Sequence, residues 1–152
     1  MGIGLLIYNR ILGAYTHTHY RLALAKARYY DKRFGIETSG DFCSKEDNSL
    51  YQDQVRYSPT LYGRLEKIVD YLKLGESDVF VDLGCGKGRA VFFAALQKIK
   101  KSVGVEIDKD LIDIARNNLL KFKLKNSPID FVHIDAANFD LKEGTVFFMF
   151  NP

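Results

Sequence analysis

The sequence predicts an α/β fold: a doubly wound parallel sheet, of which the chain holds the first four strands, behind an N-terminal helical cap. Three observations predict it. Between residues 78 and 150, short apolar runs alternate with segments of helical periodicity, as in parallel strands joined by helices. A turn with three alternating glycines follows the first run. Residues 5–30 have helical spacing of their own. We therefore expect a cap and linker over 1–56 and a core over 57–152.

The predicted cap helix carries two faces of different character. Apolar residues fall on one stripe at helical spacing: Leu5, Tyr8, Ile11, Leu12, Tyr15, Leu22 and Tyr29. Arg10, His17, Arg21 and Arg28 fall on the other side, and the only acid up to Arg33 is Asp31. We favour a stripe that packs on its own domain and a solvated basic face. A basic helix on a membrane surface, or bound to an acidic partner, stays open.

Composition places few demands on function. The chain has 152 residues, 47% of them hydrophobic, which is enough for a core of one domain. The net charge of +3 is too small to imply nucleic acid. Cys43 and Cys85 are isolated, without metal-ligand spacing, and Cys85 lies inside the glycine turn. A reducing, cytoplasmic location is therefore expected. No run has the length of a membrane-spanning helix, and the start lacks the features of a signal peptide.

The elements follow in order. Residues 35–56 are polar and indicate a linker. Ser58 and Pro59 predict the N-cap and first turn of a helix, and Gly75 its end. The apolar face of this helix would consist of Leu61, Leu65, Ile68, Val69 and Leu72. The remaining apolar runs predict strands over 78–83, 102–106, 129–133 and 146–150, and helices over 88–99 and 109–120.

The glycine turn carries most of the chemistry. Val79-Phe80-Val81 ends in Asp82, and Gly84, Gly86 and Gly88 follow at every second position before an apolar helix. Such glycines allow a sharp turn and the close approach of a ligand, and Asp82 would lie where a parallel sheet binds ligands. A dinucleotide fingerprint, G-x-G-x-x-G, is the nearest rival, but it needs a small residue where Arg89 stands. Beside a pyrophosphate, moreover, the Asp82 carboxylate would be repulsive.

The pattern D-x-G-x-G-x-G resembles motif I of the class I, Rossmann-like S-adenosylmethionine-dependent methyltransferases. This resemblance implies that Asp82 and the Gly84–Gly88 loop hold the methionine end of S-adenosylmethionine. Glu106, 24 positions after Asp82, ends the next strand, and its two oxygens would accept both ribose hydroxyls. The alternative for Glu106 is a simple cap of the following helix.

The adenine site would lie farther along the same sheet edge. Ile107 would pack on the face of adenine, Asp135 would accept from its amino group, and the amide of Ala136 would donate to a ring nitrogen. An acid at the end of the third strand also resembles the family. The alternative is that Asp135 is an ordinary turn residue.

Further segments resemble parts of the family. Asn151-Pro152 resembles the start of motif IV of amino-directed methyltransferases, which implies that Asn151 orients the acceptor nitrogen. Asn-Pro is also a common turn dipeptide. The run from Tyr57 to Thr60 resembles a segment that closes over the methionine end in lysine-directed relatives, which makes Tyr57 and Thr60 cofactor neighbours. Residues 31–40 resemble the lead-in of some uncharacterised prokaryotic methyltransferases.

The resemblance therefore implies methyl transfer from S-adenosylmethionine to nitrogen, in a protein lysine or another amine, without a metal, and possible kinship with Rossmann-type lysine methyltransferases. The alternative is a non-catalytic module that binds S-adenosylmethionine and acts as a partner or regulatory subunit. The family fold carries seven strands, whereas this sequence reaches the fourth, Val146–Phe150. We therefore expect a fragment, or a chain that oligomerises through its exposed fourth strand.

Overall fold

The computed structural model describes residues 3–40 and 57–150, with side chains from residue 18 onward. Cys43, Asn151 and Pro152 lie outside the described residues. The elements are α1 (Ile3–Phe34), α2 (Tyr62–Leu72), β1 (Val79–Leu83), α3 (Arg89–Ala94), β2 (Lys101–Glu106), α4 (Lys109–Lys121), β3 (Ile129–His133), the 3-10 turn η1 (Ala136–Asn138) and β4 (Val146–Met149).

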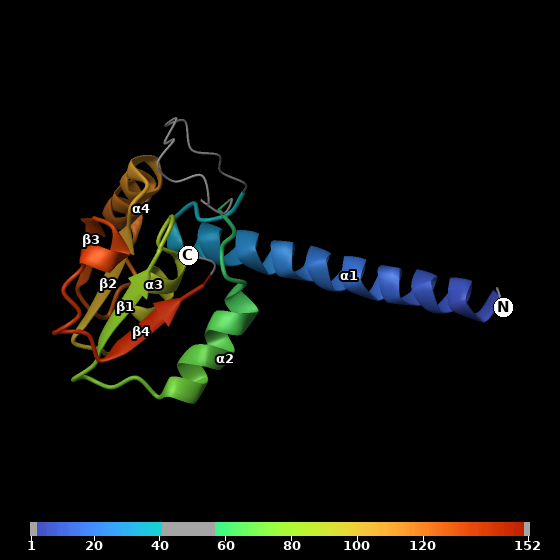
Figure 1. Ribbon diagram of the computed structural model, residues 1–152, viewed down its shortest axis with the longest axis horizontal. Helices are drawn as coiled ribbons and strands as arrows, with labels where there is room; N and C mark the ends of the chain where they lie inside the picture. The colour runs from blue at the N-terminus through green and yellow to red at the C-terminus, as the bar shows by residue number, and fades with distance from the viewer. Residues whose placement is uncertain (1–2, 41–56, 151–152) are drawn as a thin grey trace.

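The four strands form one parallel sheet in the order β3-β2-β1-β4 (Figure 1). In the register, Asp82 of β1 stands opposite Gly104 of β2 and Phe148 of β4. The chain adds β2 and β3 on one side of β1 and then crosses to the other side for β4. The reversal creates a switch point at the carboxyl ends of β1 and β4, where open α/β sheets bind their ligands. The predicted α/β fold with four parallel strands is confirmed.

Two apolar clusters cover the two faces of the sheet. The larger one contains residues from all four helices, and at its centre Phe92 is fully buried, 5.0 Å from the ring of Phe122 and 5.4 Å from that of Phe131. The smaller one contains Val81 and Val105 from the strands, and Phe139 from the β3–β4 connection. The sequence predicted helices on both faces. Among the described residues, the second face is covered by this connection instead.

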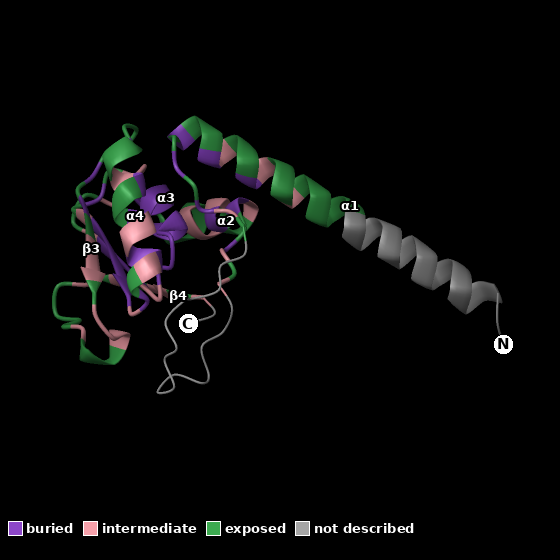
Figure 2. Cartoon of the chain, turned by 90° about the horizontal axis from the view of Figure 1, so that it is seen from above, coloured by how far each residue is buried: buried purple, intermediate pink, exposed green. Residues whose placement is uncertain are grey.

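Helix α1 packs on the domain only with its C-terminal turns, and its N-terminal part runs away from the sheet (Figure 1). Ala27 and Phe34 are buried, and Tyr30 stacks on Tyr62 of α2 at 4.6 Å. The predicted apolar stripe is wrong where the structure describes it, because Leu22 and Tyr29 are 62% and 57% exposed. The contact with α2 determines the buried face of the helix, and Figure 2 shows that most of the described residues of α1, from 18 to 34, are exposed.

Docking of α1 includes polar contacts to α2. Glu66 accepts hydrogen bonds from Lys26 and from the hydroxyl of Tyr30. The hydrogen bond to Glu66, together with burial, raises the pKa of Tyr30 to about 12. No helix in the described part of the chain is long and apolar enough to cross a membrane.

Both predicted ends of α2 are wrong. Leu61, rather than Ser58, is the N-cap, and no side chain caps this helix. Residues 57–60 precede the helix because the carbonyl of Thr60 accepts a hydrogen bond from Arg89. The helix stops at Leu72 with Lys73 in the left-handed conformation, and Gly75 follows in a turn, where its N–H donates to Asp78 at 2.7 Å.

Helix α3 is shorter than the predicted 88–99. It ends at Ala94, and the chain continues through turns to Ile99, whose N–H donates to the hydroxyl of Ser127 at 3.0 Å. In a continued helix the N–H of Ile99 would donate to the carbonyl of Ala95, which here accepts from the N–H of Asn126. The hydroxyl of Ser127 takes the place of that carbonyl. Strand β4 is an edge of the described sheet: Phe148 packs on Phe80, whereas Phe147 and Met149 are 46% and 61% exposed. Oligomerisation through β4 stays a prediction.

The central position of Phe92 leads to a stability prediction. Phe92→Ala should lower the free energy of unfolding by about 3–5 kcal/mol, because it removes a buried ring and leaves a cavity. Leu120→Ala is the control, since Leu120 is 82% exposed on α4 and should change that energy by less than about 0.5 kcal/mol. Urea denaturation measures both. Equal effects of the two variants would contradict the described core.

Candidate active site

The glycine loop joins β1 to α3 in a conformation that depends on its glycines. Gly84, Gly86 and Gly88 have φ values of +79°, +52° and +86°, in the region that side chains disfavour. The N–H groups of Gly84 and Cys85 both donate to the carbonyl of Val105 at 2.9 Å, so the loop folds over the end of β2. At Gly88 a Cβ would lie 2.6 Å from the ring of Phe131. The loop is therefore fixed beside the switch point.

Asp82 lies beneath this loop at the end of β1. Its side chain is only 4% exposed, and no residue in the described part of the chain donates a hydrogen bond to it. Burial, and then the nearby carboxylate of Glu106, raise the pKa of Asp82 to about 8. A buried carboxyl without donors is costly to ionise unless a cation approaches it. Asp82 is therefore prepared for a positively charged ligand group.

Glu106 differs from Asp82, because backbone N–H groups donate hydrogen bonds to both of its carboxylate oxygens. Its Oε2 accepts from the N–H of Gly86 at 2.7 Å, and its Oε1 accepts from the N–H groups of Ile107 and Asp108 at 2.9 Å each. One lone pair on Oε2 remains, which suits one hydroxyl group and not the two that the sequence predicted, because Oε1 already accepts two N–H groups. Helix α4 is capped by the side chain of Asp108, which accepts from Leu111. The alternative that Glu106 caps this helix is therefore wrong, and its predicted role toward ribose stays a prediction.

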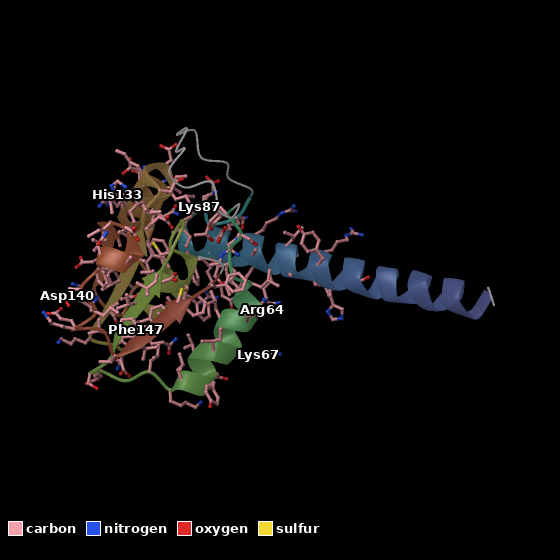
Figure 3. All side chains as sticks on the ribbon, in the orientation of Figure 1. Arg64, Lys67, Lys87, His133, Asp140 and Phe147 are labelled. Carbon is pink, nitrogen blue, oxygen red and sulfur yellow. The ribbon has the colours of Figure 1, made fainter. Side chains whose placement is uncertain are left out.

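The residues predicted to surround adenine lie at the ends of β2 and β3. His133, the last residue of β3, contacts the carbonyl of Ile107 through Nε2 at 2.9 Å. Oδ1 of Asp135 accepts from the N–H of Ala137, so Asp135 caps η1. The turn role that the sequence left open is therefore real. It leaves Oδ2 for a ligand, and the adenine contacts of Ile107, Asp135 and Ala136 stay predictions. Figure 3 shows Lys87 of the glycine loop and His133 at the same edge of the sheet.

Tyr57 and Thr60, the other predicted cofactor neighbours, belong to the segment before α2, which packs beside the glycine loop. The ring of Tyr57 lies against Gly86 so closely that a Cβ there would overlap it. Burial raises the pKa of Tyr57, and Asp82 is among the charges that act on it. Thr60 is buried, and its described hydrogen bond is the one from Arg89 to its carbonyl oxygen, at 3.2 Å. Tyr57 thus adjoins the expected methionine end, whereas the visible role of Thr60 is structural.

The sequence alone predicts no functional role for Asp31, Thr38 and Arg89, which form a buried cluster in the structure. Arg89 is 3% exposed, and its Nε donates to the hydroxyl of Thr38 at 2.8 Å. Asp31 accepts from the N–H and the hydroxyl of Thr38 at 3.0 and 2.7 Å. The one sequence signal for this cluster was the resemblance of residues 31–40 to the lead-in of some methyltransferases.

Among the described residues no three His, Cys, Asp or Glu side chains gather as metal ligands.

The sequence matches a family model and several known proteins. The family described as "Histone methylation protein DOT1" matches residues 44–145. A protein-lysine N-methyltransferase of Saccharolobus islandicus (strain REY15A) is 36% identical over 104 residues, covering 66% of this chain and 62% of the relative. The H3 lysine-79 specific histone-lysine N-methyltransferase of Dictyostelium discoideum is 31% identical over 125 residues, covering 71% of this chain and 7% of the relative.

A solved structure shows a similar fold. It is an RNA methyltransferase from Salinibacter ruber in complex with S-adenosyl-L-homocysteine. The TM-score is 0.55 and the sequence identity is 32%, with 60% of each chain covered. The chain thus spans less than two thirds of the length of these relatives.

The state of Asp82 leads to a pH prediction. An ammonium group binds the carboxylate and not the neutral acid, so affinity for S-adenosylhomocysteine should rise with pH below the pKa of Asp82, about 8, and level off above it. The rise should approach tenfold per pH unit where Asp82 starts protonated. Titration calorimetry measures it. Asp82→Asn should abolish the dependence, and methylthioadenosine, which lacks the ammonium, should not show it. A flat wild-type profile would contradict the role of Asp82.

Proposed function

Because the chain belongs to the family of the histone methylation protein DOT1, we propose that it is an S-adenosylmethionine-dependent methyltransferase whose acceptor is the side-chain amine of a protein lysine. The observation that carries the first half is the donor-free, buried carboxyl of Asp82 at the switch point. It lies beneath a loop whose three glycines all have positive φ.

The described residues fit the cofactor in chain order along the sheet edge. Asp82 would receive the ammonium group of the methionine end, and the ring of Tyr57 lies against Gly86 of the glycine loop. Glu106 would accept a ribose hydroxyl through Oε2 while it holds Gly86. Ile107, Asp135 and Ala136 would surround the adenine. The cofactor supplies an electrophilic methyl group on a sulfonium.

The protein's part in the reaction is orientation. A neutral amine would attack the methyl carbon in line and displace the thioether sulfur, with S-adenosylhomocysteine as the leaving group, so the rate would depend on the direction of the amine lone pair and on the amine being neutral. Asn151 is the residue that the sequence predicts to direct the acceptor nitrogen, and it lies outside the described residues.

Two relatives support lysine as the acceptor, since both are named lysine methyltransferases at 31% and 36% identity. The Salinibacter ruber enzyme of similar fold is named an RNA methyltransferase, which makes RNA the acceptor to test against lysine.

Transfer of labelled methyl groups to cell extract tests the acceptor. We expect label that protease releases, that ribonuclease leaves in place, and that acid hydrolysis yields as methyl-lysine. Asp82→Asn is the matched control, because it keeps the shape and loses the charge. It should weaken cofactor binding by about tenfold or more, as expected when a hydrogen bond to a charged group is lost. Label sensitive to ribonuclease would reassign the acceptor to RNA. Cofactor binding without any transfer would identify a non-catalytic module.

A further inference from the structure

A two-residue segment, Thr38–Ser39, lies between the end of α1 and the glycine loop, and we refer to it as the anchor segment. Thr38 is fully buried although it is polar. Its N–H and its hydroxyl donate to Asp31, the hydroxyl of Ser39 donates to the same carboxylate at 2.8 Å, and the hydroxyl of Tyr62 donates to it at 2.7 Å. Asp31 thus fixes the anchor segment to α1 and α2.

Arg89 binds the anchor segment from the other side. It is the first residue of α3, directly after Gly88. Its Nε donates to the hydroxyl of Thr38 at 2.8 Å, and one terminal nitrogen donates to the hydroxyl of Ser39 at 2.9 Å. The other terminal nitrogen donates to the carbonyl of Thr60. The guanidinium also lies 4.6 Å from the centre of the Tyr62 ring. Three acceptors in different directions suit a planar guanidinium and not an ammonium group.

The carbonyls of the anchor segment reach the loop itself. The carbonyl of Ser39 accepts from Nζ of Lys87 at 3.1 Å, within the run Gly86-Lys87-Gly88. The carbonyl of Thr38 accepts from the hydroxyl of Tyr57 at 2.7 Å, and the ring of Tyr57 lies on Gly86. Lys87 within the loop and Arg89 at its end are therefore tied to residues that lie 48 to 51 positions earlier in the chain. The ring of Tyr57 is tied to Thr38, 19 positions before it.

We propose that Arg89 is a positioning residue for the cofactor: through the anchor segment it holds Gly86–Gly88 and Tyr57 in the geometry that binds S-adenosylmethionine. The proposal rests on cofactor binding at this loop and is independent of the acceptor. Stability alone does not account for the cluster, since a buried ion pair is often no more stabilising than apolar side chains of the same volume. What the polar contacts add is direction, because each acceptor fixes one part of the loop.

The test compares variants that differ in one polar group. Arg89→Lys keeps the charge near Asp31, whose Oδ2 lies 3.8 Å from Arg89, but cannot reach three acceptors. Thr38→Val removes the hydroxyl at nearly constant volume, and Thr38→Ser keeps the hydroxyl and removes a methyl group. Calorimetry with S-adenosylhomocysteine measures affinity, thermal melting measures stability, and hydrogen exchange measures protection of the peptide spanning residues 84–89.

Arg89→Lys and Thr38→Val should each weaken binding by about tenfold, because a loop that loses one hydrogen bond to a charged group populates its binding geometry less, and the apparent affinity falls by that fraction. Exchange should quicken in residues 84–89 and stay unchanged in β2 and β3. Thr38→Ser should melt at a lower temperature yet bind within about twofold of wild type. If Arg89→Lys does not fold, the contrast between Thr38→Val and Thr38→Ser decides.

Unchanged affinity in folded Arg89→Lys and Thr38→Val, with only lower melting temperatures, would overturn the positioning role and leave the cofactor site intact. A wild-type chain that does not bind S-adenosylhomocysteine would overturn the cofactor proposal, and the positioning role with it. The wild-type measurement therefore separates the two failures.

Discussion

The buried carboxyl groups of Asp82 and Glu106 determine the rest of the site. They end adjacent parallel strands under one loop, and two like charges there cannot both be ionised cheaply. Glu106 accepts three backbone N–H groups, one of them from the glycine loop. Asp82 accepts none from the described residues. Glu106 thereby ties the loop to β2. Ionisation of Asp82 is the costly step in this arrangement, and a cationic ligand group would lower that cost.

The surroundings of the loop come from distant parts of the chain. Phe131 of β3 packs against Gly88, and Tyr57 packs against Gly86. The contacts of Arg89 and Lys87 add the segment after α1. A loop with three positive φ values has little stiffness of its own. Its shape therefore depends on these neighbours, which explains why so many polar groups are buried around it.

The strands and the glycine loop could be predicted because their signals are local: apolar runs such as Val79–Val81 and glycines at fixed spacing. What failed depended on contacts between distant residues. Ser58-Pro59 has the local chemistry of a helix start, but α2 begins only at Tyr62, after the carbonyl of Thr60 has accepted a hydrogen bond from Arg89. Leu22 and Tyr29 fit an apolar stripe, yet the position of Tyr62 selects another face of α1. Arg89 itself gave no signal beyond not being small.

Aromatic rings form a continuous path from α1 to the sheet. Tyr30 and Phe34 contact Tyr62, Phe34 contacts Phe122, and Phe92 joins Phe122 to Phe131. Packed elements of this kind open together as one cooperative unit. We therefore expect the turns of α1 from Ala27 to Phe34 to unfold with the sheet in a single transition. Residues 18–26 of the same helix, none of which is buried, contribute no buried side chain to that unit. One continuous helix thus crosses the limit of the cooperative unit near Ala27, its first buried residue in the described part.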